Sequence, residues 1–156
     1  LVGLGYLNNA EATAARYRDT PSYSKYYELH DRCVYSGDVG WKDEDGFLYF
    51  VGRTDRMIKS NGFRIAPEEI EQAVTAHTSY GLCYALGEKH PVHGQIIVII
   101  VESDETPELK RIQLELRPHI SGFMIPEKVM QVSKMPLNSN GKVDGKALRN
   151  ALGLSS

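Results

Sequence analysis

The pattern of hydrophobic and polar positions divides the chain into two parts. Residues 1–25 carry short apolar pieces and one helical run over residues 11–18, which are too short to build a core. Farther on, an acidic turn at residues 43–46 leads into the apolar, aromatic run 47–51, a pattern typical of the second strand of a hairpin. We place a domain boundary at residues 52–55 and interpret the chain before it as the β-rich tail of a domain.

The second part, residues 54–156, alternates between strand and helix patterns. Asn61-Gly62 lies between two short apolar runs and favours a two-residue hairpin turn. Thr106 and Pro107 are expected to begin a helix, because threonine caps helices and proline fits their first turn. The predicted strands cover residues 83–86, 95–101 and 127–132, and the predicted helices cover residues 67–76, 107–116 and 144–152. The fold class is therefore α+β, a small sheet flanked by helices.

The composition is that of a folded protein, since 42% of the 156 residues are hydrophobic and 24% are charged. With 18 lysines and arginines against 20 acidic residues, the net charge of −2 argues against a nucleic-acid or anionic-membrane partner. The longest apolar run, residues 96–101, is far shorter than the roughly 20 residues of a membrane-spanning helix. Cys33 and Cys83 are isolated in the sequence, which favours a reducing compartment, and we expect the cytoplasm.

Three glycine-marked polar segments contain the candidate functional residues. Asp38 follows a glycine, and an aspartate in such a turn can accept hydrogen bonds from the two hydroxyls of a ribose. Arg53 can place its forked guanidinium on a phosphate, although it can equally pair with Glu44 or Asp45 on the surface. Lys142 lies in a polar loop and suits a negative charge that develops during a reaction, although solvated lysines are common in such loops.

Four motifs follow one another along the chain at characteristic distances. They are Tyr-Ser-Gly-Asp at residues 35–38, Gly-Arg-Thr-Asp at 52–55, Lys-Ser-Asn-Gly-Phe-Arg at 59–64 and Asn-Gly-Lys at 140–142. Their order and spacing resemble the adenylate-forming enzymes, the superfamily of acyl-CoA synthetases, peptide-synthetase adenylation domains and luciferases. The resemblance covers nearly the whole chain. It implies that residues 1–53 end the large N-terminal domain and that residues 54–156 form the mobile C-terminal domain.

The resemblance also implies a role for each candidate residue. Asp38 is expected to bind the ribose hydroxyls of ATP or AMP, with Arg53 assisting at the ribose and the phosphates. Asp55 matches the hinge about which the small domain swings. Lys142 is expected to bridge the carboxylate substrate and the α-phosphate during adenylation. The resemblance assigns Lys59, Gly62 and Arg64 to the later, thioester-forming step. Gly62 is expected to line the channel for the pantetheine arm.

The implied activity is that of an ATP-dependent acid–thiol ligase, which activates a carboxylic acid as acyl-AMP and transfers the acyl group to coenzyme A. ATP, Mg²⁺ arriving with ATP, and CoA are the expected cofactors. The segment from Lys59 to Gly62 resembles CoA ligases more than peptide synthetases, although an adenylation domain that loads a carrier-protein phosphopantetheine is the alternative. The sequence contains no Ser/Thr/Gly-rich phosphate loop. We therefore expect the chain alone to be catalytically incomplete and to depend on the large N-terminal domain.

Two interpretations compete with this one. A non-catalytic module that docks on a carrier protein or on the large domain has the same size and fold class. A nucleic-acid-binding module needs a basic strip, for which the candidates are Arg53, Arg56, Lys59 and Arg64. Asp55 interrupts this strip and the net charge opposes it, so we expect no nucleic-acid partner.

His90 and His93 lack a third ligand nearby in the sequence, so no metal site is expected there.

Overall fold

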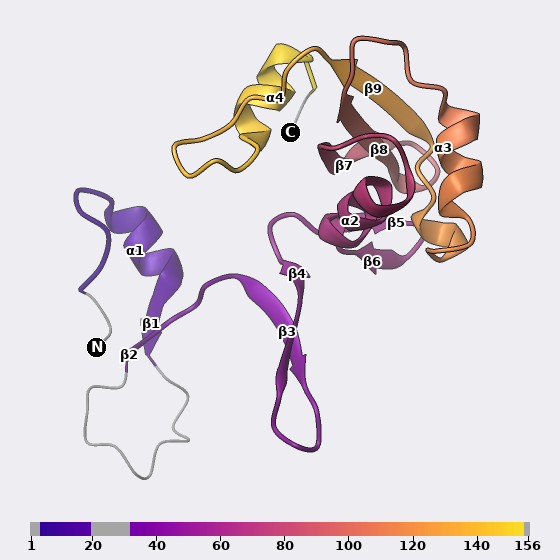
Figure 1. Cartoon of the computed structure of the whole chain (residues 1–156). Helices are drawn as coiled ribbons and strands as arrows, with labels where there is room; N and C mark the ends of the chain where they lie inside the picture. The colour runs from indigo at the N-terminus through magenta and orange to yellow at the C-terminus, as the bar shows by residue number, and fades with distance from the viewer. Residues whose placement is uncertain (1–3, 20–31, 155–156) are drawn as a thin grey trace. The chain divides into compact units, whose positions relative to one another are not determined.

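The structure is a computed structural model that describes residues 4–19 and 32–154. It forms two compact units, which divide after Asp55 (Figure 1). Within residues 4–19 and 32–55, the first unit contains one helix and two short antiparallel strand pairs. The second unit contains a five-stranded sheet and the remaining helices. The assignment of the first unit to the end of a larger domain stays a prediction.

The first helix, α1 (Ala10–Arg16), begins at a side-chain cap, because Asn9 Oδ1 accepts a hydrogen bond of 2.9 Å from the Ala12 N–H. The sequence predicted that this helix extends to residue 18, and that prediction is wrong. Tyr17 already has extended backbone angles, φ −100° and ψ 107°. It starts strand β1 (Tyr17–Asp19), which pairs antiparallel with β2 (Arg32–Val34). This strand pairing ends the helix at Arg16.

Strands β3 (Asp38–Lys42) and β4 (Leu48–Arg53) form the hairpin predicted around the acidic turn. The second strand is longer than the apolar run, because Gly52 and Arg53 continue the ladder. A bulge between Val39 and Gly40 shifts the register, and beyond it Asp38 lies directly opposite Arg53. The hairpin therefore brings together two residues that are fifteen positions apart in the sequence.

The second unit is organised around strand β8, which is almost completely apolar. One edge of β8 pairs antiparallel with β7 along its length, and the other edge pairs with β9 in parallel and with β5 at one position. Strand β6 completes the sheet by pairing with β5. The bounds are β5 (Ile58–Ser60), β6 (Phe63–Ile65), β7 (Cys83–His90), β8 (Gly94–Glu102) and β9 (Lys128–Val132). All the predicted strands of this unit are confirmed.

Helices cover both faces of this sheet (Figure 1). Side chains of a strand alternate between faces, so Ile97 and Ile99 of β8 pack with helices α2 and α3, whereas Val98 and Ile100 pack with Leu148 of α4. The helices are α2 (Pro67–His77), α3 (Leu109–Leu116), the 3₁₀ turn η1 (Gly122–Met124) and α4 (Gly145–Ala151). The predicted α+β class is confirmed. Within the described residues no helix has the length and apolarity that a membrane crossing requires.

Helix α3 starts later than the sequence predicted. Its N-cap is Glu108, which has extended angles and makes no capping bond with its side chain, so Thr106 and Pro107 lie outside the helix. The hydroxyl of Ser103 accepts from the Glu105 N–H at 3.1 Å and donates to the Glu105 carbonyl at 2.8 Å. This local turn gives the residues before the helix a competing hydrogen-bond arrangement.

The contact of α4 with the sheet gives a stability prediction. Leu148 is 1% exposed and packs with Leu86, Val98, Ile100 and Met135. Leu148→Ala is expected to lower the free energy of unfolding by about 3 kcal/mol, because it removes buried methyl groups and leaves a cavity. Chemical denaturation followed by circular dichroism measures this change. Leu114→Ala is the matched control, since Leu114 is 65% exposed, and equal losses in the two variants would contradict the packing described.

Candidate functional site

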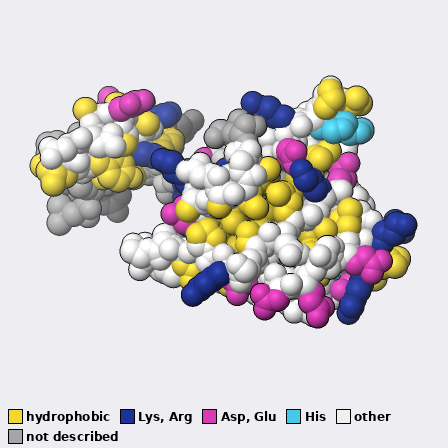
Figure 2. Space-filling model, turned by 90° about the horizontal axis from the view of Figure 1, so that it is seen from above, with side chains coloured by type: hydrophobic (Ala, Val, Ile, Leu, Met, Phe, Trp, Pro, Cys, Tyr) yellow, Lys and Arg dark blue, Asp and Glu magenta, His cyan; other side chains and the backbone are white. Residues whose placement is uncertain are grey.

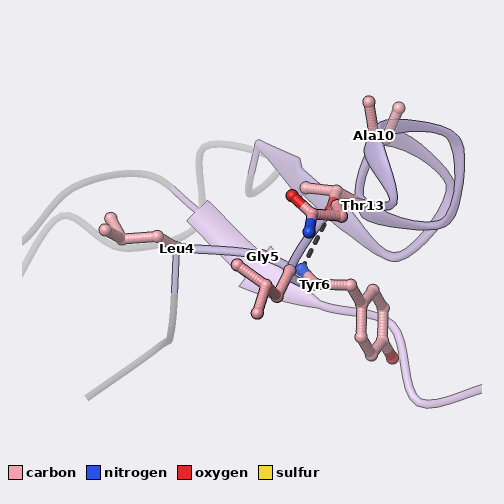
Figure 3. A pocket seen from close by; sticks show the side chains of 8 residues that line it. Leu4, Gly5, Tyr6, Ala10 and Thr13 are labelled. Carbon is pink, nitrogen blue, oxygen red and sulfur yellow. Dashed lines mark hydrogen bonds between the residues drawn. The ribbon is translucent and has the colours of Figure 1, made fainter.

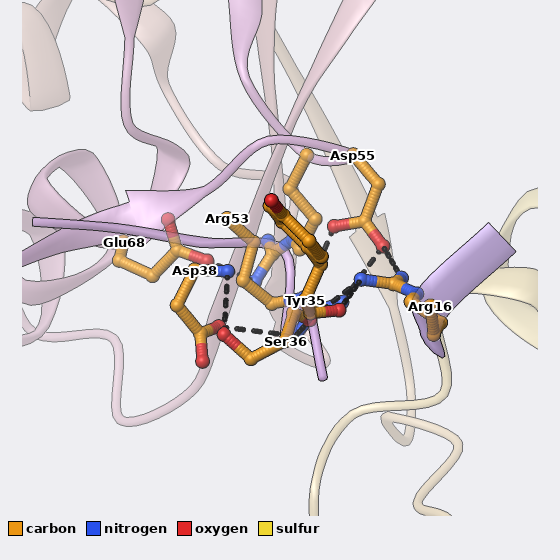
Figure 4. A network of polar contacts seen from close by, with 8 residues as sticks. Arg16, Tyr35, Ser36, Asp38, Arg53, Asp55 and Glu68 are labelled. Atoms are coloured by element: carbon orange, nitrogen blue, oxygen red, sulfur yellow. Dashed lines mark hydrogen bonds and ion pairs between the residues drawn. The ribbon is translucent and has the colours of Figure 1, made fainter. Parts of the chain in front are cut away.

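In the first unit, three of the residues expected to act together are in direct contact (Figure 4). Arg53 Nη1 donates to Asp38 Oδ1 at 3.1 Å. The other side of the same guanidinium binds Asp55 with two parallel bonds, Nε to Oδ1 at 3.0 Å and Nη2 to Oδ2 at 2.9 Å. The alternative pairing of Arg53 with Glu44 or Asp45 is therefore wrong.

The backbone of the Tyr35–Asp38 segment is shaped by short-range bonds. The Asp38 N–H donates to Ser36 Oγ at 3.2 Å, and the Thr54 N–H donates to the Gly37 carbonyl at 2.8 Å. Gly37 has φ +85°, and a Cβ on it would meet the guanidinium of Arg16. The backbone conformation therefore favours glycine, and a Cβ at this position would displace the Arg16 guanidinium.

Arg16 is a member of this cluster that the sequence did not indicate. Its Nη1 atom donates to the carbonyl of Ser36 at 2.6 Å and to that of Tyr35 at 3.2 Å, and its Nη2 atom lies 3.7 Å from Asp55 Oδ2. Arg16 ends helix α1, twenty residues before Ser36, and no local motif marks it. It fixes the carbonyls of the turn that carries Asp38.

The cluster leaves one acceptor open. Asp38 is 44% exposed, and its Oδ2 atom makes no hydrogen bond to another described residue. A carboxylate oxygen in this position can accept from a vicinal diol, while Arg53 holds the other oxygen of the same carboxylate. The chemistry of this pair fits the ribose of a nucleotide.

Electrostatics within the cluster favour the ionised forms. The hydrogen bonds from Arg53 hold the pKa of Asp55 below its ordinary value of 3.8, and Asp55 in turn raises the pKa of Arg53. Because the pKa of Asp55 is depressed, the pair stabilises the fold at pH values above 3.8, and this contribution is lost as the pH falls through the lowered pKa.

Replacing Arg53 tests this coupling. In Arg53→Gln the carboxyl of Asp55 is expected to titrate at a higher pH than in the wild-type chain, with its pKa returning toward 3.8, because both charge-assisted bonds are lost. Carboxyl ¹³C NMR titration measures the pKa directly. Arg111→Gln is the control, since Arg111 pairs with Glu115 on helix α3 and should leave the Asp55 titration unchanged. Coincident Asp55 titrations in wild type and Arg53→Gln would contradict the pairing.

In the second unit, the Lys59–Arg64 segment forms the predicted hairpin. Asn61 has φ +50° and Gly62 has φ +82°, so both residues of the turn are left-handed, as a tight two-residue hairpin requires. Lys59 lies opposite Arg64 in the ladder, and both side chains are exposed without an ion pair among the described residues. Two like charges that face each other repel, so an anionic ligand on this face is favoured. Gly62 has open space around it, since a Cβ there would contact nothing within 4 Å.

Lys142 lies in the tight loop before α4. The side chain of Asn138 accepts from the N–H groups of Asn140 and Lys142 at 2.9 and 3.1 Å, and the Asn138 N–H donates to the Lys142 carbonyl at 2.8 Å. Gly141 has φ +75° and completes the turn. The backbone at Lys142 is thus fixed, whereas its exposed ammonium group has no partner among the residues that the structure describes.

The hairpin and the Lys142 loop are anchored on opposite faces of the sheet. Ile58 and Ile65 of the hairpin pack in the cluster with α2 and α3. Val143, next to the lysine, packs in the other cluster with Leu148 of α4. The two segments are therefore fixed to different cores of the second unit.

Two of the four basic residues considered for nucleic-acid binding, Arg53 and Arg56, are paired with acidic side chains. The guanidinium of Arg56 is paired with Glu68 and Glu71 of α2 and lies 4.6 Å from the ring centre of Tyr84. Arg53 is likewise neutralised by acidic partners. On the face shown in Figure 2, basic side chains are scattered among acidic ones. These contacts argue against nucleic-acid binding, which needs a continuous run of free cations.

A shallow apolar pocket in the first unit carries no catalytic chemistry (Figure 3). It has a volume of about 550 Å³, and the Tyr6 N–H donates to Thr13 Oγ1 at 2.9 Å beside it. Among the described residues that line it there is no carboxylate, imidazole, thiol or cation. Elsewhere in residues 4–19 and 32–154, no group of three or more His, Cys, Asp or Glu side chains is arranged to hold a metal ion.

Comparison with known proteins places these features in a family context. Residues 69–142 match the family described as AMP-binding enzyme C-terminal domain. The chain is 32% identical to one of the linear gramicidin synthase proteins of Brevibacillus parabrevis over 94% of its length, and 27% identical to oxalate–CoA ligase of Saccharomyces cerevisiae over 99%. The crystal structure of ATP-bound MatB from Rhodopseudomonas palustris superposes on 95% of the chain with 25% identity and a TM-score of 0.72.

The chain corresponds to only part of each of these proteins. It spans 2% of the gramicidin synthase protein, 27% of the oxalate–CoA ligase and 28% of the MatB chain. The relatives include both peptide synthetases and CoA ligases.

Proposed function

Because residues 69–142 belong to the AMP-binding enzyme C-terminal domain family, we propose that this chain is the C-terminal part of an ATP-dependent acid–thiol ligase. In the first step a carboxylate oxygen of the acid attacks the α-phosphorus of ATP, and pyrophosphate leaves. In the second step a thiol attacks the acyl carbon, and AMP leaves as the thioester forms. The observation that carries the proposal is the pair of exposed cationic segments, anchored on opposite faces of one family-matched domain.

The first unit supplies part of the nucleotide site in this proposal. Asp38 accepts hydrogen bonds from the ribose hydroxyls through its open Oδ2 atom, and Arg53, which donates to Asp38 Oδ1, orients the carboxylate and assists at the ribose. The ATP-bound state of the MatB relative supports a nucleotide here. Mg²⁺ enters with ATP and is held chiefly by the phosphates.

Lys142 is the proposed catalytic residue of the adenylation step. Its backbone is fixed by Asn138 while its ammonium group is unpaired among the described residues, so the charge can be delivered to a ligand without first breaking an ion pair. Placed between the carboxylate and the α-phosphate, it offsets the negative charge that builds up as they approach.

The hairpin is the proposed element of the thioester-forming step. Gly62 leaves the space that a pantetheine arm needs, and Lys59 and Arg64 offer charge to phosphate groups that accompany it. For the hairpin to take the place of Lys142 in the active site, the second unit must rotate. We assign the hinge to Asp55, where the two units divide. The chain depends on a large N-terminal domain for acid selection and for the rest of the nucleotide site, so alone it is catalytically incomplete.

Coenzyme A is the proposed acceptor. The sequence of the hairpin and the similarity to oxalate–CoA ligase over 99% of the chain support it. A carrier-protein phosphopantetheine is the second candidate, because the gramicidin synthase protein is equally well aligned over 94% of the chain. A docking module without chemistry is the third candidate function.

Cys33 and Cys83 are free thiols, which agrees with a reducing compartment such as the cytoplasm.

ATP–pyrophosphate exchange with a panel of carboxylic acids tests the proposal. The chain alone is compared with a ligase in which it follows a large adenylation domain, and each acid that supports exchange is then offered with CoA or with a phosphopantetheinyl carrier protein. We expect exchange only in the presence of the large domain and thioester formation with CoA. Absence of exchange with every acid would favour the docking module, and thioester formation only on the carrier protein would reassign the acceptor.

A further inference from the structure

The turn between β7 and β8 and the start of β8 hold the Lys59–Arg64 hairpin, and we propose that His93 of the turn and Gln95 of β8 are positioning residues for the thioester-forming step, given the function proposed above. Neither residue belongs to the four motifs. Both are bonded to the hairpin immediately before Gly62, and both lie more than thirty residues away from it in the sequence.

The hairpin is attached to the sheet by very few backbone bonds. Strand β5 pairs with β6 at three positions but with β8 only at the Ser60–Gly94 bridge. A two-stranded hairpin is marginally stable by itself. Ile58 and Ile65 fix the base of the hairpin in the core, and the position of its turn depends on what else connects it to β8 and to the turn before β8.

Gln95 replaces a missing bond of the ladder. Its Oε1 atom accepts from the Lys59 N–H at 2.6 Å, next to the single Ser60–Gly94 bridge between the two strands. The amide lies over Gly87 of the adjoining strand, where a Cβ would approach the Gln95 Cδ to 2.7 Å. The absence of a side chain at position 87 thus gives the Gln95 amide room to reach β5.

His93 binds the turn of the hairpin from two sides. Its carbonyl accepts from the Asn61 N–H at 3.1 Å, and its ring Nδ1 lies 2.7 Å from Asn61 Oδ1. Because an amide oxygen only accepts, the imidazole donates from Nδ1–H. The ring is itself held by stacking on His90 with 4.6 Å between centroids, and His90 Nδ1 accepts from the His93 N–H at 3.3 Å.

Three consecutive hairpin residues, Lys59, Ser60 and Asn61, are thus bound to the segment 93–95. The next residue is Gly62, whose placement decides whether a thiol arm can pass. Without the two side-chain bonds, only a few backbone bonds hold the turn, and its position on the sheet can shift. A displacement of about 1 Å at a reacting centre can lower a rate about 100-fold, so we expect a loss of 10- to 100-fold in thioester formation. Adenylation should be spared, since Lys142 is anchored on the other face of the sheet.

The experiment uses the ligase that joins this chain to its large domain, with CoA as the thiol and each half-reaction measured separately. His93→Leu and Gln95→Met remove the donor and the acceptor while preserving bulk. His93→Asn and Gln95→Glu are the rescue variants, because each keeps a polar atom near the original position. Val92→Ala is the matched control in the same turn, since Val92 is 79% exposed. Adenylation is followed by ATP–pyrophosphate exchange, and thioester formation by quenching preformed acyl-adenylate with saturating CoA.

We expect His93→Leu and Gln95→Met to lower the thioester rate 10- to 100-fold at saturating CoA, with exchange within about twofold of wild type and with rescue by the polar variants. Equal losses in both half-reactions, or an unchanged thioester rate, overturn the positioning role. The proposed function fails by a different result, namely no exchange in wild type or full exchange in Lys142→Ala. Wild-type enzyme that forms acyl-adenylate but no thioester with CoA overturns the acceptor and this inference together.

Discussion

Lys142→Ala is expected to lower ATP–pyrophosphate exchange about 100- to 1000-fold, the usual effect of removing one preorganised group from a charged transition state. The ammonium group is exposed and unpaired among the described residues, so no other contact is lost with it. The loop should keep its shape, because Asn138 binds the backbone and not the side chain of Lys142. Exchange assays with the large domain present measure the loss.

Lys146→Ala is the matched control for this prediction. Lys146 is an exposed lysine in the first turn of α4, four residues farther along, and its backbone N–H donates to Asp144. Exchange in Lys146→Ala should stay within about twofold of wild type, as is usual for surface substitutions. If both lysine variants lost activity equally, general charge rather than the position of Lys142 would be responsible.

Gly62→Leu is expected to lower thioester formation about 100-fold and to leave pyrophosphate exchange intact. The glycine is left-handed and has open space around it, so a leucine adds backbone strain but meets no neighbouring atom, and it fills the space proposed for the pantetheine arm. Transfer of the acyl group from preformed acyl-adenylate to CoA measures the step.

Two controls separate bulk from backbone strain. Gly62→Ala carries the same left-handed penalty, roughly 1–2 kcal/mol, with little bulk, and should retain most of the thioester activity. Gly81→Leu adds the same side chain at a glycine that also has nothing within 4 Å, away from the hairpin. Similar losses in Gly62→Leu and Gly62→Ala would attribute the effect to strain, and the channel role of Gly62 would be abandoned.

Local sequence patterns predicted the elements of the second unit well. The Asn61-Gly62 pair specified its turn, because these residue types tolerate the left-handed angles of +50° and +82° that the structure has. The continuous apolar run of β8 was recognised as a strand, and the alternation of Ile97 and Val98 between two cores explains why that run is apolar on both faces.

Long-range contacts were beyond the reach of those patterns. Arg16 binds the carbonyl of Ser36 across an intervening segment, and Gln95 binds Lys59 across thirty-six positions, so neither pairing follows from spacing. The start of α3 was missed because the Ser103 hydroxyl forms a local turn that outweighs a favourable Thr106-Pro107 start. Side-chain hydrogen bonds of this kind depend on tertiary position and not on residue type alone.

The placement of the two cationic segments gives a physical reason for domain rotation in the proposed mechanism. A single sheet holds the Lys142 loop against one core and the hairpin against the other, and in the proposed mechanism only one of the two segments acts in each step. Adenylation needs positive charge, and thioester formation needs space for a thiol arm. Separate segments meet these two demands without compromise.

One measurement tests that division of labour directly: a single-turnover quench with acid, ATP and CoA, in which acyl-adenylate and acyl-CoA are quantified in the same sample. We predict that wild type forms acyl-CoA, that Gly62→Leu accumulates acyl-adenylate with little acyl-CoA, and that Lys142→Ala accumulates neither. If Gly62→Leu and Lys142→Ala gave the same distribution of the two products, the assignment of the loop and the hairpin to successive steps would be contradicted.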